Sequence, residues 1–482
     1  MWQGDTFGGY WLIVALWLSG FFILYFILLN GTYLSFIIAG VLSLRRYAHD
    51  AAVSSNYSLL RSALTKPISV LVPAHNEERN IIETATSLLL LHYPRFEVVI
   101  INDGSTDETL QRLIDHFGLV ERHKVYRRKL NSMRVRAIYE SPKNPELVVI
   151  DKENGGKSDA LNCGINVSSY PFFCVIDADT VLEEDSLLKM VRPFLDRPES
   201  MVAVGGIVRV ANNCTVERGH VIDIRLPHSL IELIQVLEYL QAFLSSRIAF
   251  SSANAVLLVS GAFGLFRKDV VIDVGGYKRT IGEDMELVVR MQRVMLKARK
   301  PCQMVFVPDP VCWTEVPRDW RSLSGQRRRW QKGLIDSIHF NSEMLFNPRF
   351  GRLGLFAMPY YLIFEMLGPI LELFGYATMI LFLIAGVLSW QWAWLFFLVS
   401  IGFGVLISSG AILLEELSFH RYPRPRQVLA LLLAALLYNL GYRQINALWR
   451  FSATFEYVGG FRLWGRIKRF GFKTGNEQKA TT

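Results

Sequence analysis

The chain has 482 residues, of which 51% are hydrophobic and 20% are charged. This composition favours one large domain with a membrane region over two or three small soluble domains. We assign the formal net charge of +9 to a surface that faces anionic membrane lipids, and we exclude nucleic acid as a partner. The five cysteines include no CxxC pair, so we expect free thiols in a reducing compartment.

The first apolar segment predicts a retained membrane anchor. Residues 10–44 contain no charged residue, and this run is far longer than the roughly 20 residues that span a bilayer. No basic stretch precedes it and no small-residue cleavage site follows it, which argues against a signal peptide. Asp5 lies before the run, and Arg45 and Arg46 follow it. The positive-inside rule then places the N-terminus outside and the chain from residue 45 onward in the cytosol.

The segment from residue 67 to residue 185 alternates between strand and helix patterns. Four short β-branched runs are the predicted strands: 68–74, 96–103, 147–153 and 172–179. The predicted helices between them are 76–91, 106–117 and 156–167, and Gly118 is placed to end the second. This order indicates an α/β fold with a parallel sheet and helices on both faces. Each strand ends in polar residues, which should meet in one crevice at the carboxyl ends of the strands.

Three further segments complete the predicted organisation. Residues 120–146 are basic and poorly periodic, and form either an extra strand pair (KVYRR with VRAIY) or a surface insertion. Residues 228–259 form either a helix in the membrane interface or a helix packed on the catalytic core. The remaining membrane candidates are 353–387, 390–414 and 427–449. The domains expected are an anchor (1–46), a cytosolic domain with interfacial helices (47–340), a transmembrane region (341–450) and a basic cytosolic tail (451–482).

The C-terminal charges do not fit three simple spans. The basic loop at 415–427 and the basic tail should both lie in the cytosol, so one of the three candidates cannot cross the membrane. The segment 427–449 is interrupted by Asn439, Gly441 and Arg443. We therefore expect this segment to be interfacial or re-entrant in a multi-pass protein of the plasma (inner) membrane.

Two carboxylates at a strand end suggest a metal site. Asp177 and Asp179 close the fourth predicted strand with one residue between them, and together they can place oxygens on one hard cation. Mg²⁺ or Mn²⁺ held by one or two carboxylates takes its other ligands from phosphates and water. The alternative interpretation is a solvated turn.

Three other strand endings suggest a site for a nucleotide. Asp103 ends the second strand, and Lys157 opens a helix after two glycines, where the helix N-terminus favours a diphosphate. His75 and Glu77 follow the first strand, with Glu77 available to a ribose hydroxyl. Helix or turn capping explains Asp103, His75 and Glu77 equally well.

Two later segments suggest residues for catalysis and substrate binding. Glu283 and Asp284 stand where a loop enters a helix, and a carboxylate there can serve as a general base. Gln326 and Arg329 share one face of a basic helix and could clamp a diphosphate, and Trp330 offers a flat surface for a sugar ring. The alternatives are helix capping for the first segment and a lipid-facing amphipathic helix for the second.

Taken in order, these residues resemble a known series of motifs. Asp103, Asp177-Ala178-Asp179, Glu283-Asp284 and Gln326-x-x-Arg329-Trp330 are similar to the D, DxD, ED and QxxRW motifs of the family 2 glycosyltransferases. They resemble most the membrane-integrated branch with cellulose, hyaluronan and poly-N-acetylglucosamine synthases. The resemblance covers residues 67–335 by motif and the rest by arrangement. Gly282 stands where cellulose synthases have Thr, which argues against cellulose as the product.

The resemblance implies a GT-A fold (a Rossmann-like mixed sheet), a UDP-sugar donor and inverting transfer. Asp284 would be the base with Glu283 beside it, and Asp177 and Asp179 would hold Mg²⁺ or Mn²⁺. Asp103 would contact the uracil and ribose. The other donor-binding residues would be Pro73, His75, Glu77, Lys157, Asp177, Gln326 and Arg329, and the acceptor would meet Trp330, Gly261 and Ala262.

The function expected from this resemblance is processive polymerisation of UDP-N-acetylglucosamine or UDP-glucose, coupled to export. The partners would be the donor, the growing polysaccharide, membrane lipids and an accessory membrane subunit. Two alternatives stay open. A non-processive transferase would glycosylate a membrane lipid instead. A transport or sugar-binding protein with a degenerate enzyme domain is disfavoured, because every catalytic carboxylate is present.

Overall fold

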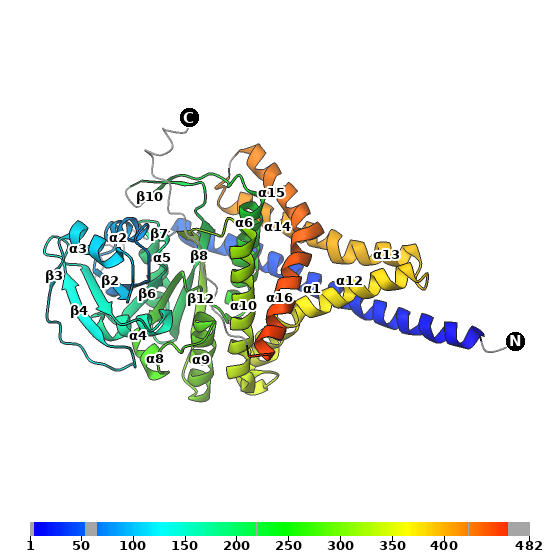
Figure 1. Cartoon of the computed structure of the whole chain (residues 1–482), viewed down its shortest axis with the longest axis horizontal. Coiled ribbons are helices and arrows are strands. Elements are labelled where there is room, and N and C mark those ends of the chain that lie inside the picture. The colour runs from blue at the N-terminus through cyan, green and yellow to red at the C-terminus, as the bar shows by residue number, and fades with distance from the viewer. Residues whose placement is uncertain (1–3, 54–64, 218–219, 423, 461–482) are drawn as a thin grey trace.

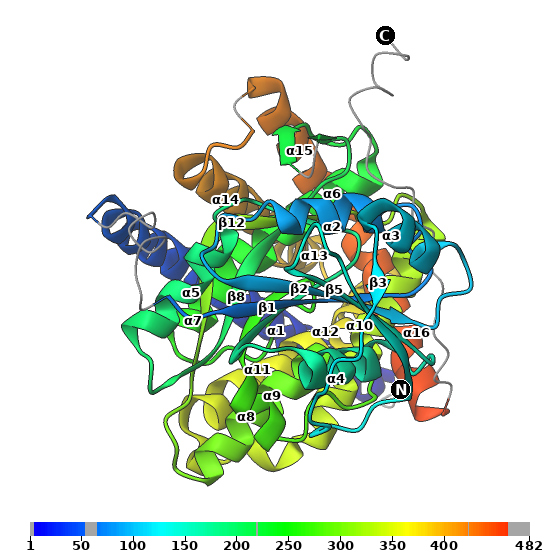
Figure 2. The ribbon, with the colours of Figure 1, turned by 90° about the vertical axis from the view of Figure 1, so that its left-hand side faces the viewer.

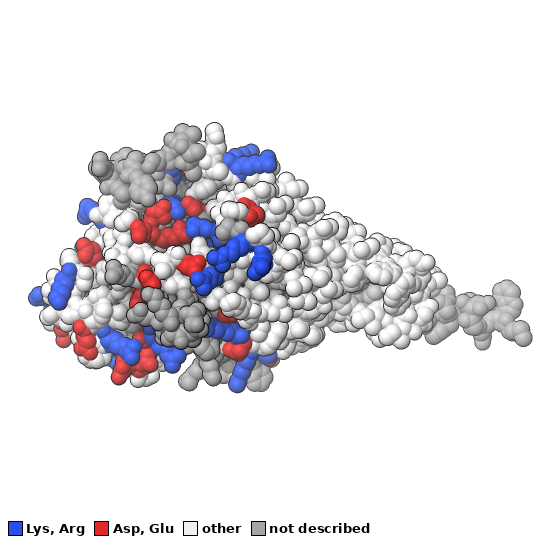
Figure 3. Space-filling model, turned by 90° about the horizontal axis from the view of Figure 1, so that it is seen from above, with Lys and Arg blue, Asp and Glu red and all other residues white. Residues whose placement is uncertain are grey.

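The computed structural model describes residues 4–53, 65–217, 220–422 and 424–460. The chain has two parts: an α/β domain and a group of long helices that extends away from it (Figure 1). Lys, Arg, Asp and Glu gather on the α/β domain, whereas the narrow part over the long helices is almost free of them (Figure 3). The five cysteines are free, as expected.

A ten-stranded sheet forms the centre of the α/β domain, in the order β3-β4-β5-β2-β1-β6-β11-β8-β12-β7. Four of its strands are the predicted ones: β1 (Ile68–Ala74), β2 (Phe96–Asp103), β5 (Leu147–Lys152) and β6 (Phe172–Ile176). These four are parallel, with Val70 opposite both Val98 and Cys174. The predicted parallel sheet is therefore confirmed, and the carboxyl ends of its strands share one edge.

The remaining strands make the sheet mixed. They are β3 (Val120–Glu121), β4 (Val135–Glu140), β7 (Thr180–Leu182), β8 (Met201–Val210), β11 (Phe263–Arg267) and β12 (Gln303–Thr314), and a separate pair is formed by β9 (Thr215–Glu217) and β10 (His220–Asp223). β4 pairs antiparallel with β5, and β11 pairs antiparallel with β6 and β8. The segment VRAIY is thus an extra strand, with β3 outside it at the edge of the sheet, whereas residues 124–128 form no strand.

Helices cover both faces of the sheet, as Figure 2 shows for α2 and α3 on one side and α4 and α8 on the other. The helices of this domain are α2 (Ile81–Leu89), α3 (Thr109–Phe117), α4 (Lys157–Val167), α5 (Ser186–Asp196), α8 (Lys268–Asp273) and α9 (Glu283–Lys297). Alternate residues of each strand enter two separate cores: Val70 and Val98 lie in one, and Leu71 and Val99 in the other. This is the period of two that a sheet covered on both faces requires.

The predicted starts of two helices were wrong by several residues. Asn76 has a left-handed backbone with φ 59°, which cannot belong to an α-helix, so α2 begins only at Ile81. The Asn76 side chain accepts a hydrogen bond from the Thr106 amide at 2.8 Å. This bond holds the start of the next connection in a turn, and α3 begins at Thr109. Gly118 ends α3 with φ 59°, as predicted.

Four helices join the sheet to the long helices: α6 (Leu230–Leu240), η2 (Gln241–Arg247), α7 (Ile248–Ser252) and α10 (Trp320–Phe340). The first three are the predicted segment 228–259. Val236 and Leu237 pack into the core of the sheet, while the Gln241 amide donates to Ser408 of a long helix at 2.6 Å. Packing on the catalytic core, one of the two alternatives, is therefore observed, and a position in the membrane interface stays a prediction.

The long helices and the short turns before them carry most of the exposed apolar residues. They are α1 (Gly4–Val53), η3 (Ser342–Met344), η4 (Pro348–Phe350), η5 (Leu353–Ala357), α11 (Met358–Tyr360), η6 (Tyr361–Met366), α12 (Gly368–Ile384), α13 (Trp390–Phe397), η7 (Leu398–Gly402), α14 (Phe403–Ser418), α15 (Pro425–Leu437), η8 (Tyr438–Tyr442) and α16 (Arg443–Val458). Among the described residues, three helices are long and apolar enough to cross a membrane: Leu12–His49, Trp390–Ser418 and Pro425–Val458. The pair 353–366 and 368–384, bent by 46°, is a fourth candidate.

The last of these helices runs in a different direction from the others. α15 and α16 run across the direction of α1, with α15 beside α6 and α16 beside α10 (Figure 1). Two contacts fasten α16 to α10: the Tyr457 hydroxyl donates to Asp336 at 2.7 Å, and the Arg450 guanidinium donates to Gln331 at 2.9 Å. Length and composition alone would allow this helix to span a membrane, but its packing holds it along the α/β domain.

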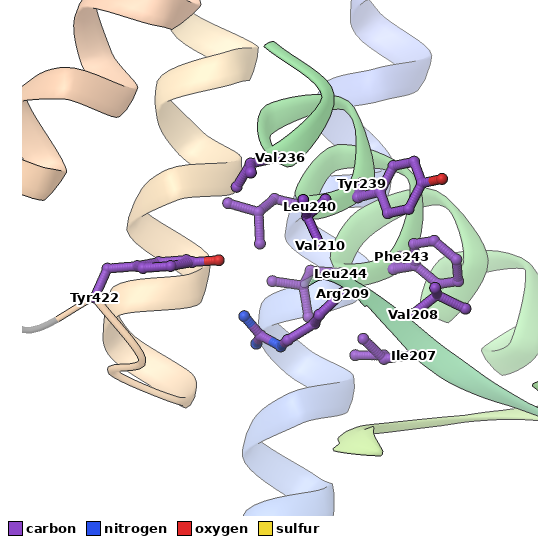
Figure 4. Close-up of a pocket in the computed structure, with 10 residues that line it drawn as sticks. All are labelled: Ile207, Val208, Arg209, Val210, Val236, Tyr239, Leu240, Phe243, Leu244 and Tyr422. Carbon is purple, nitrogen blue, oxygen red and sulfur yellow. The ribbon is translucent and has the colours of Figure 1, made fainter. Parts of the chain in front are cut away.

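A small cavity lies between β8, α6 and the loop after α14 (Figure 4). Its volume of about 10 Å³ has room for about one water molecule. Arg209 enters it and forms a buried ion pair with Glu415 of α14 at 2.6 Å. This cavity is a gap in the joint between the sheet and the long helices, and it is too small to admit a substrate.

Candidate active site

The Asp-x-Asp segment lies at the carboxyl edge of the sheet, as the sequence predicted. Asp177 and Asp179 occupy the link between β6 and β7. A hydrogen bond from the Thr84 hydroxyl to the Ala178 carbonyl, 2.7 Å long, fixes this link against α2. The Asp177 side chain is 30% exposed, and Asp179 is buried. The segment therefore offers one accessible carboxylate and a second one just inside the domain.

Lys157 is the central cation of the site. Its Nζ lies 2.6 Å from Asp177 Oδ1 and 4.0 Å from Glu283 Oε1. Gly156, with φ 87°, allows the chain to turn into α4 at this point. Burial lowers the pKa of Lys157, but the two carboxylates outweigh burial and raise it above its usual value. Lys157 is therefore charged at neutral pH, with carboxylates from two different elements as its partners.

Glu283 and Asp284 begin α9 on the other side of Lys157. Asp284 Oδ2 accepts a hydrogen bond from the Gly261 amide at 3.1 Å, and its Oδ1 accepts one from Met285 at 2.8 Å. A Cβ atom at Gly261 would stand 3.2 Å from Lys157 Nζ and 3.4 Å from Asp284 Oδ2. Gly261 therefore allows the cation and the carboxylate to approach its backbone closely, and Ala262 follows it in the turn before β11.

The residue before this acidic pair must be glycine in this fold. A Cβ atom at Gly282 would lie 2.7 Å from the Gly333 carbonyl oxygen and 2.8 Å from its Cα. These atoms belong to the backbone of α10, which cannot move aside as a flexible side chain would. The presence of Gly282, where cellulose synthases have Thr, thus has a physical cause, because the start of α9 touches α10 directly. The same contact packs the acidic pair against the helix that carries Trp330.

Glu283 is a buried carboxyl group with an altered acidity. Burial raises its pKa from 4.5 to about 7, Lys157 opposes the rise, and the negative charge of Asp284 adds to it. Between pH 4.5 and 7 the folded chain therefore keeps a proton on Glu283 that the unfolded chain has already released. The stability contributed by this proton is fully present below pH 4.5 and is lost as the pH rises through 7.

We expect Glu283→Gln to remove this pH dependence. The melting temperature of the variant minus that of the wild type should rise between pH 5 and pH 8, because only the wild type must then bury a charged group. Thermal denaturation of the purified chain in EDTA measures this difference. Glu121→Gln, on the exposed strand β3, is the control. A difference that is flat or falls with pH would contradict the assignment.

The ends of β1, β2 and β5 meet in a second cluster next to Lys157. Asp103 is buried, and both of its carboxylate oxygens accept hydrogen bonds: Oδ1 from Lys152 and from the Gly155 amide, and Oδ2 from the Gly156 amide at 2.7 Å. His75 Nδ1 lies 3.0 Å from the Asp103 carbonyl oxygen. The predicted convergence of the strand ends is therefore observed.

Asp103 thus shapes the turn that leads to Lys157. Its predicted contact with the uracil and ribose stays a prediction, as do the donor roles of His75, Glu77 and Pro73. Glu77 is buried in the connection between β1 and α2, and Pro73 lies in β1 opposite Ile101. Sequence reasoning missed Lys152, which is fully buried. A lysine at the end of a continuous apolar strand was the available signal, because such a lysine needs carboxylate partners.

The helix α10 carries the Gln-x-x-Arg-Trp segment. Gln326 Oε1 is buried and has no hydrogen-bond partner, Arg329 is partly buried, and Trp330 is 50% exposed. The predicted roles of these residues in binding stay predictions. The neighbouring Arg327 was not predicted, yet it is buried and donates to Glu238 of α6 at 2.5 Å and to Tyr442 at 3.3 Å. Arg327 therefore ties α6, α10 and η8 together.

Two family models match the chain. Residues 66–333 match the family described as "Glycosyltransferase like family 2", and residues 278–453 match "Chitin synthase". The first match covers more than half of the chain and includes every predicted motif. The chain therefore belongs to the family 2 glycosyltransferases, and the predicted class of enzyme is confirmed.

Curated relatives point to one branch of this family. The chain is 31% identical over 268 residues to the poly-beta-1,6-N-acetyl-D-glucosamine synthase of Staphylococcus epidermidis, covering 55% of this chain and 54% of the relative. It is 29% identical over 307 residues to the enzyme of that name from Staphylococcus aureus (strain COL), covering 63% of this chain and 62% of the relative. The matches thus span little more than half the length of these relatives.

Solved structures give weaker similarities. A mannosyltransferase from Pyrobaculum calidifontis, in complex with GDP-Man and Mn²⁺, has a TM-score of 0.47 at 18% identity, over 86% of this chain and 99% of that chain. TarS 1-349 of S. aureus with UDP-GlcNAc has a TM-score of 0.35 at 14% identity, over 78% and 92%. The family match and the mixed sheet confirm the predicted GT-A fold class.

Proposed function

We propose that this chain is a processive, inverting glycosyltransferase that polymerises a UDP-sugar, UDP-N-acetylglucosamine or UDP-glucose, into a β-linked polysaccharide. One observation carries the proposal: Lys157 contacts Asp177 and approaches Glu283, while the Gly261 amide donates a hydrogen bond to the adjacent Asp284. A cation for a leaving diphosphate and a carboxylate for an acceptor hydroxyl are therefore neighbours. The similarity to poly-N-acetylglucosamine synthases supports a polymer as product.

The proposed chemistry needs no covalent intermediate. Asp284 removes the proton from the acceptor hydroxyl, and the oxygen attacks the anomeric carbon opposite the leaving diphosphate. The bond from this carbon to the diphosphate oxygen breaks, and UDP leaves with the electron pair. Lys157 and Arg329 stabilise the negative charge that develops on the diphosphate, a contribution that is usually the largest in such sites.

The acidic residues fit a divalent metal that is bound together with the donor. Asp177 and Asp179 supply hard oxygen ligands, and the described residues contain no cluster of three or more metal-ligating side chains. Two carboxylates suit Mg²⁺ or Mn²⁺, which would complete its coordination with diphosphate oxygens and water. When bound, the ion would supply positive charge against the leaving diphosphate.

Charge and helix direction support a membrane orientation with the α/β domain in the cytosol. α1, α12 and α13–α14 extend away from the α/β domain together (Figure 1), so α1 would carry the chain into the cytosol, α12 out again and α13–α14 back in. The basic segment after Ser418 would then lie in the cytosol. Because α15 packs on α6 and α16 packs on α10, the chain up to residue 460 would stay on the same side. This arrangement satisfies both basic segments, although residues 461–482 of the predicted tail lie outside the described residues.

Polar contacts between the long helices support passage of a polar product. Arg443 of α16 forms an ion pair with Glu372 of α12 at 2.7 Å, and the hydroxyls of Tyr33 and Tyr360 reach Glu365 at 3.4 and 3.2 Å. Charged groups are costly within a membrane and mark functional pathways. An accessory membrane subunit and lipids that surround these helices complete the proposed partners.

Donor screening with product sizing tests the proposed function. The purified chain is incubated with a panel of UDP-sugars, UDP release is followed, and the products are separated by size. We expect UDP release from one hexose or hexosamine donor and a ladder of product sizes. A single glycolipid would establish the lipid-glycosylating alternative, and absence of UDP release from every donor would refute transferase activity.

We expect metal removal to abolish the activity of the wild type. EDTA should stop UDP release, and Mg²⁺ or Mn²⁺ should restore it, because the leaving diphosphate needs a counter-charge. Asp179→Ala should show little activity and no stimulation by either metal. Asp196→Ala, at the end of α5 away from the strand ends, is the matched control and should behave like the wild type. An Asp179→Ala variant as active in EDTA as the wild type with metal would refute the metal role.

A further inference from the structure

Asp336 is a buried carboxylate of α10 that contacts two other elements of the chain. Its Oδ2 accepts a hydrogen bond from the Ile281 amide at 3.3 Å, and its Oδ1 accepts one from the Tyr457 hydroxyl at 2.7 Å. Ile281 and Gly282 directly precede Glu283, where α9 begins, whereas Tyr457 belongs to α16. Asp336 therefore links the loop before the acidic pair to a helix from the far end of the sequence.

The backbone of this loop lies directly against α10. A Cβ atom at Gly333 would stand 2.8 Å from the Gly282 Cα atom and 2.9 Å from its nitrogen. The Ser337 hydroxyl donates to the Gly333 carbonyl at 2.8 Å and lies 3.5 Å from the Gly282 carbonyl oxygen. The Gly282 carbonyl oxygen also accepts the Glu286 amide at 2.9 Å, a bond of the first turn of α9. The surface of α10 thus sets where α9 begins.

The contact between the two glycines cannot fix the loop along α10 by itself. Packed elements are held in register by side chains that interlock, and glycine has none. The hydrogen bond from Ile281 to Asp336 supplies a directional contact, because such bonds weaken steeply as their geometry departs from linear. Asp284, the proposed base, follows closely in the chain, and its Oδ2 accepts the Gly261 amide at 3.1 Å. A shift of the loop would therefore displace Asp284 from its place beside Gly261.

The helix α16 runs beside α10 and holds the face that carries Asp336 (Figure 1). Arg328, Lys332 and Asp336 are spaced four residues apart, so they share one face of α10. Glu456 of α16 forms ion pairs with Arg328 and, at 3.0 Å, with Lys332. Tyr457 follows Glu456 and donates to Asp336. One oxygen of Asp336 is thus bound by α16, and the other accepts the amide of the loop before α9.

We propose that Asp336 is a positioning residue for the proposed base: it fixes the loop before α9, so that Asp284 stands where it can take the proton of the acceptor hydroxyl. This role rests on the transferase activity proposed above. Asp336 acts through Ile281 and contacts neither substrate. Tyr457 orients the Asp336 carboxylate, and α16 thereby contributes to the geometry of the active site through its contact with α10.

A double-variant cycle tests this role. Asp336→Ala, Asp284→Asn and their combination are compared with the wild type, as the full chain in nanodiscs of phosphatidylethanolamine and phosphatidylglycerol. UDP release from the donor found in the screen gives kcat and KM, and calorimetry gives the Kd of UDP. We expect Asp336→Ala to lower kcat about 10- to 100-fold, as a displacement of about 1 Å does, and to keep the KM and the Kd. In the Asp284→Asn background the same change should lower kcat by less than about two-fold, because no base is left to position.

A conservative variant and a matched control accompany the cycle. Asp336→Asn keeps an oxygen that can accept the Ile281 amide, so it should restore part of the kcat that Asp336→Ala loses. Asn341→Ala truncates a fully buried side chain near the end of α10, whose amide bonds to the Ser337 carbonyl of the same helix. It should lower the melting temperature of the chain and leave kcat unchanged.

Three kinetic results would overturn the proposed role. An unchanged kcat in Asp336→Ala would show that the loop keeps its place without the carboxylate. A loss of the same size in the Asp284→Asn background would show that Asp336 does not act through the base. A loss in Asn341→Ala as large as in Asp336→Ala would assign both effects to the stability of α10. If Asp336→Ala does not fold, Tyr457→Phe takes its place in the cycle, and its smaller loss of kcat should likewise disappear in the Asp284→Asn background.

Hydrogen exchange separates this proposal from the proposed function. If the wild type releases no UDP from any donor, the proposed function fails, and amide exchange of residues 277–285, followed by mass spectrometry, still measures whether Asp336 holds the loop. We expect exchange in this segment to be faster in Asp336→Ala than in the wild type, and unchanged in Asn341→Ala. Exchange in Asp336→Ala equal to that of the wild type would show that Asp336 does not fix the loop, whatever the activity.

Discussion

Asp284→Asn should fold, bind UDP with the affinity of the wild type and transfer sugar about 10²- to 10⁴-fold more slowly, the range expected for the loss of a general base. The variant keeps an oxygen that can accept the hydrogen bond from Gly261, which is 3.1 Å long in the wild type. The geometry of the site should therefore survive, and only the ability to take a proton is lost. The measurements are the initial rate of UDP release and the Kd of UDP by calorimetry.

A matched control distinguishes the loss of the base from a general effect of the substitution. Asp273→Asn makes the same chemical change at the exposed end of α8 and should leave the rate unchanged. Because Asp284 lies next to Glu283, the double variant with Glu283→Gln shows whether Glu283 can replace the base. Turnover of Asp284→Asn within a few-fold of the wild type would refute the assignment of Asp284.

The sequence predicted the centre of the fold well because its signals are local. The four parallel strands are continuous apolar runs, and their bounds agree with the prediction to within a few residues. The helix starts were less predictable. Asn76 looked like the beginning of a helix, but it adopts a left-handed turn because its side chain bonds to Thr106, 30 residues away. Such a contact exists only after folding, so no local pattern reveals it.

The candidate site was predictable in its carboxylates and much less so in its cations. Asp177, Asp179, Glu283 and Asp284 stand at strand or helix ends in a recognisable order. Their partners are set by packing: Arg327 is indistinguishable by sequence from its neighbours in a run of three arginines, yet it alone of the three is fully enclosed, by α6 and η8. The contact of Gly282 with Gly333 likewise joins residues 51 positions apart.

The membrane region shows how charge and packing complement each other. The basic segments demanded that one of the three C-terminal candidates should not cross the membrane, and residues 427–449 were the expected exception. By length and hydropathy alone, Pro425–Val458 could still span a membrane. The observed contacts of Tyr457 and Arg450 with α10 hold this helix along the α/β domain, an arrangement that agrees with the charge argument. The domain boundaries themselves stay predictions.

Lys152→Met should destabilise the chain strongly, because it removes the cation of a buried ion pair. Lys152 Nζ is fully buried, contacts Asp103, and lies 2.7 Å from Asp159 Oδ1 and 2.6 Å from the Glu153 carbonyl oxygen. Removing one partner of a buried ion pair costs about 3–5 kcal/mol, because the other charge stays buried without compensation. The melting temperature of the purified chain should fall by several degrees. UDP binding should weaken as well, since Asp103 holds the turn before Lys157.

Two further variants test whether the loss of stability comes from the Asp103 carboxylate that is left buried without a cation. Lys297→Met removes an exposed pair with Glu343, 2.6 Å long, and should cost at most about 1 kcal/mol, as exposed pairs do. Adding Asp103→Asn to Lys152→Met removes the uncompensated carboxylate, and part of the lost stability should return, because replacing both partners is less costly than removing one. A double variant less stable than Lys152→Met would show that the Asp103 carboxylate is stabilised mainly by the Gly155 and Gly156 amides. Lys152 would then contribute little to that stability.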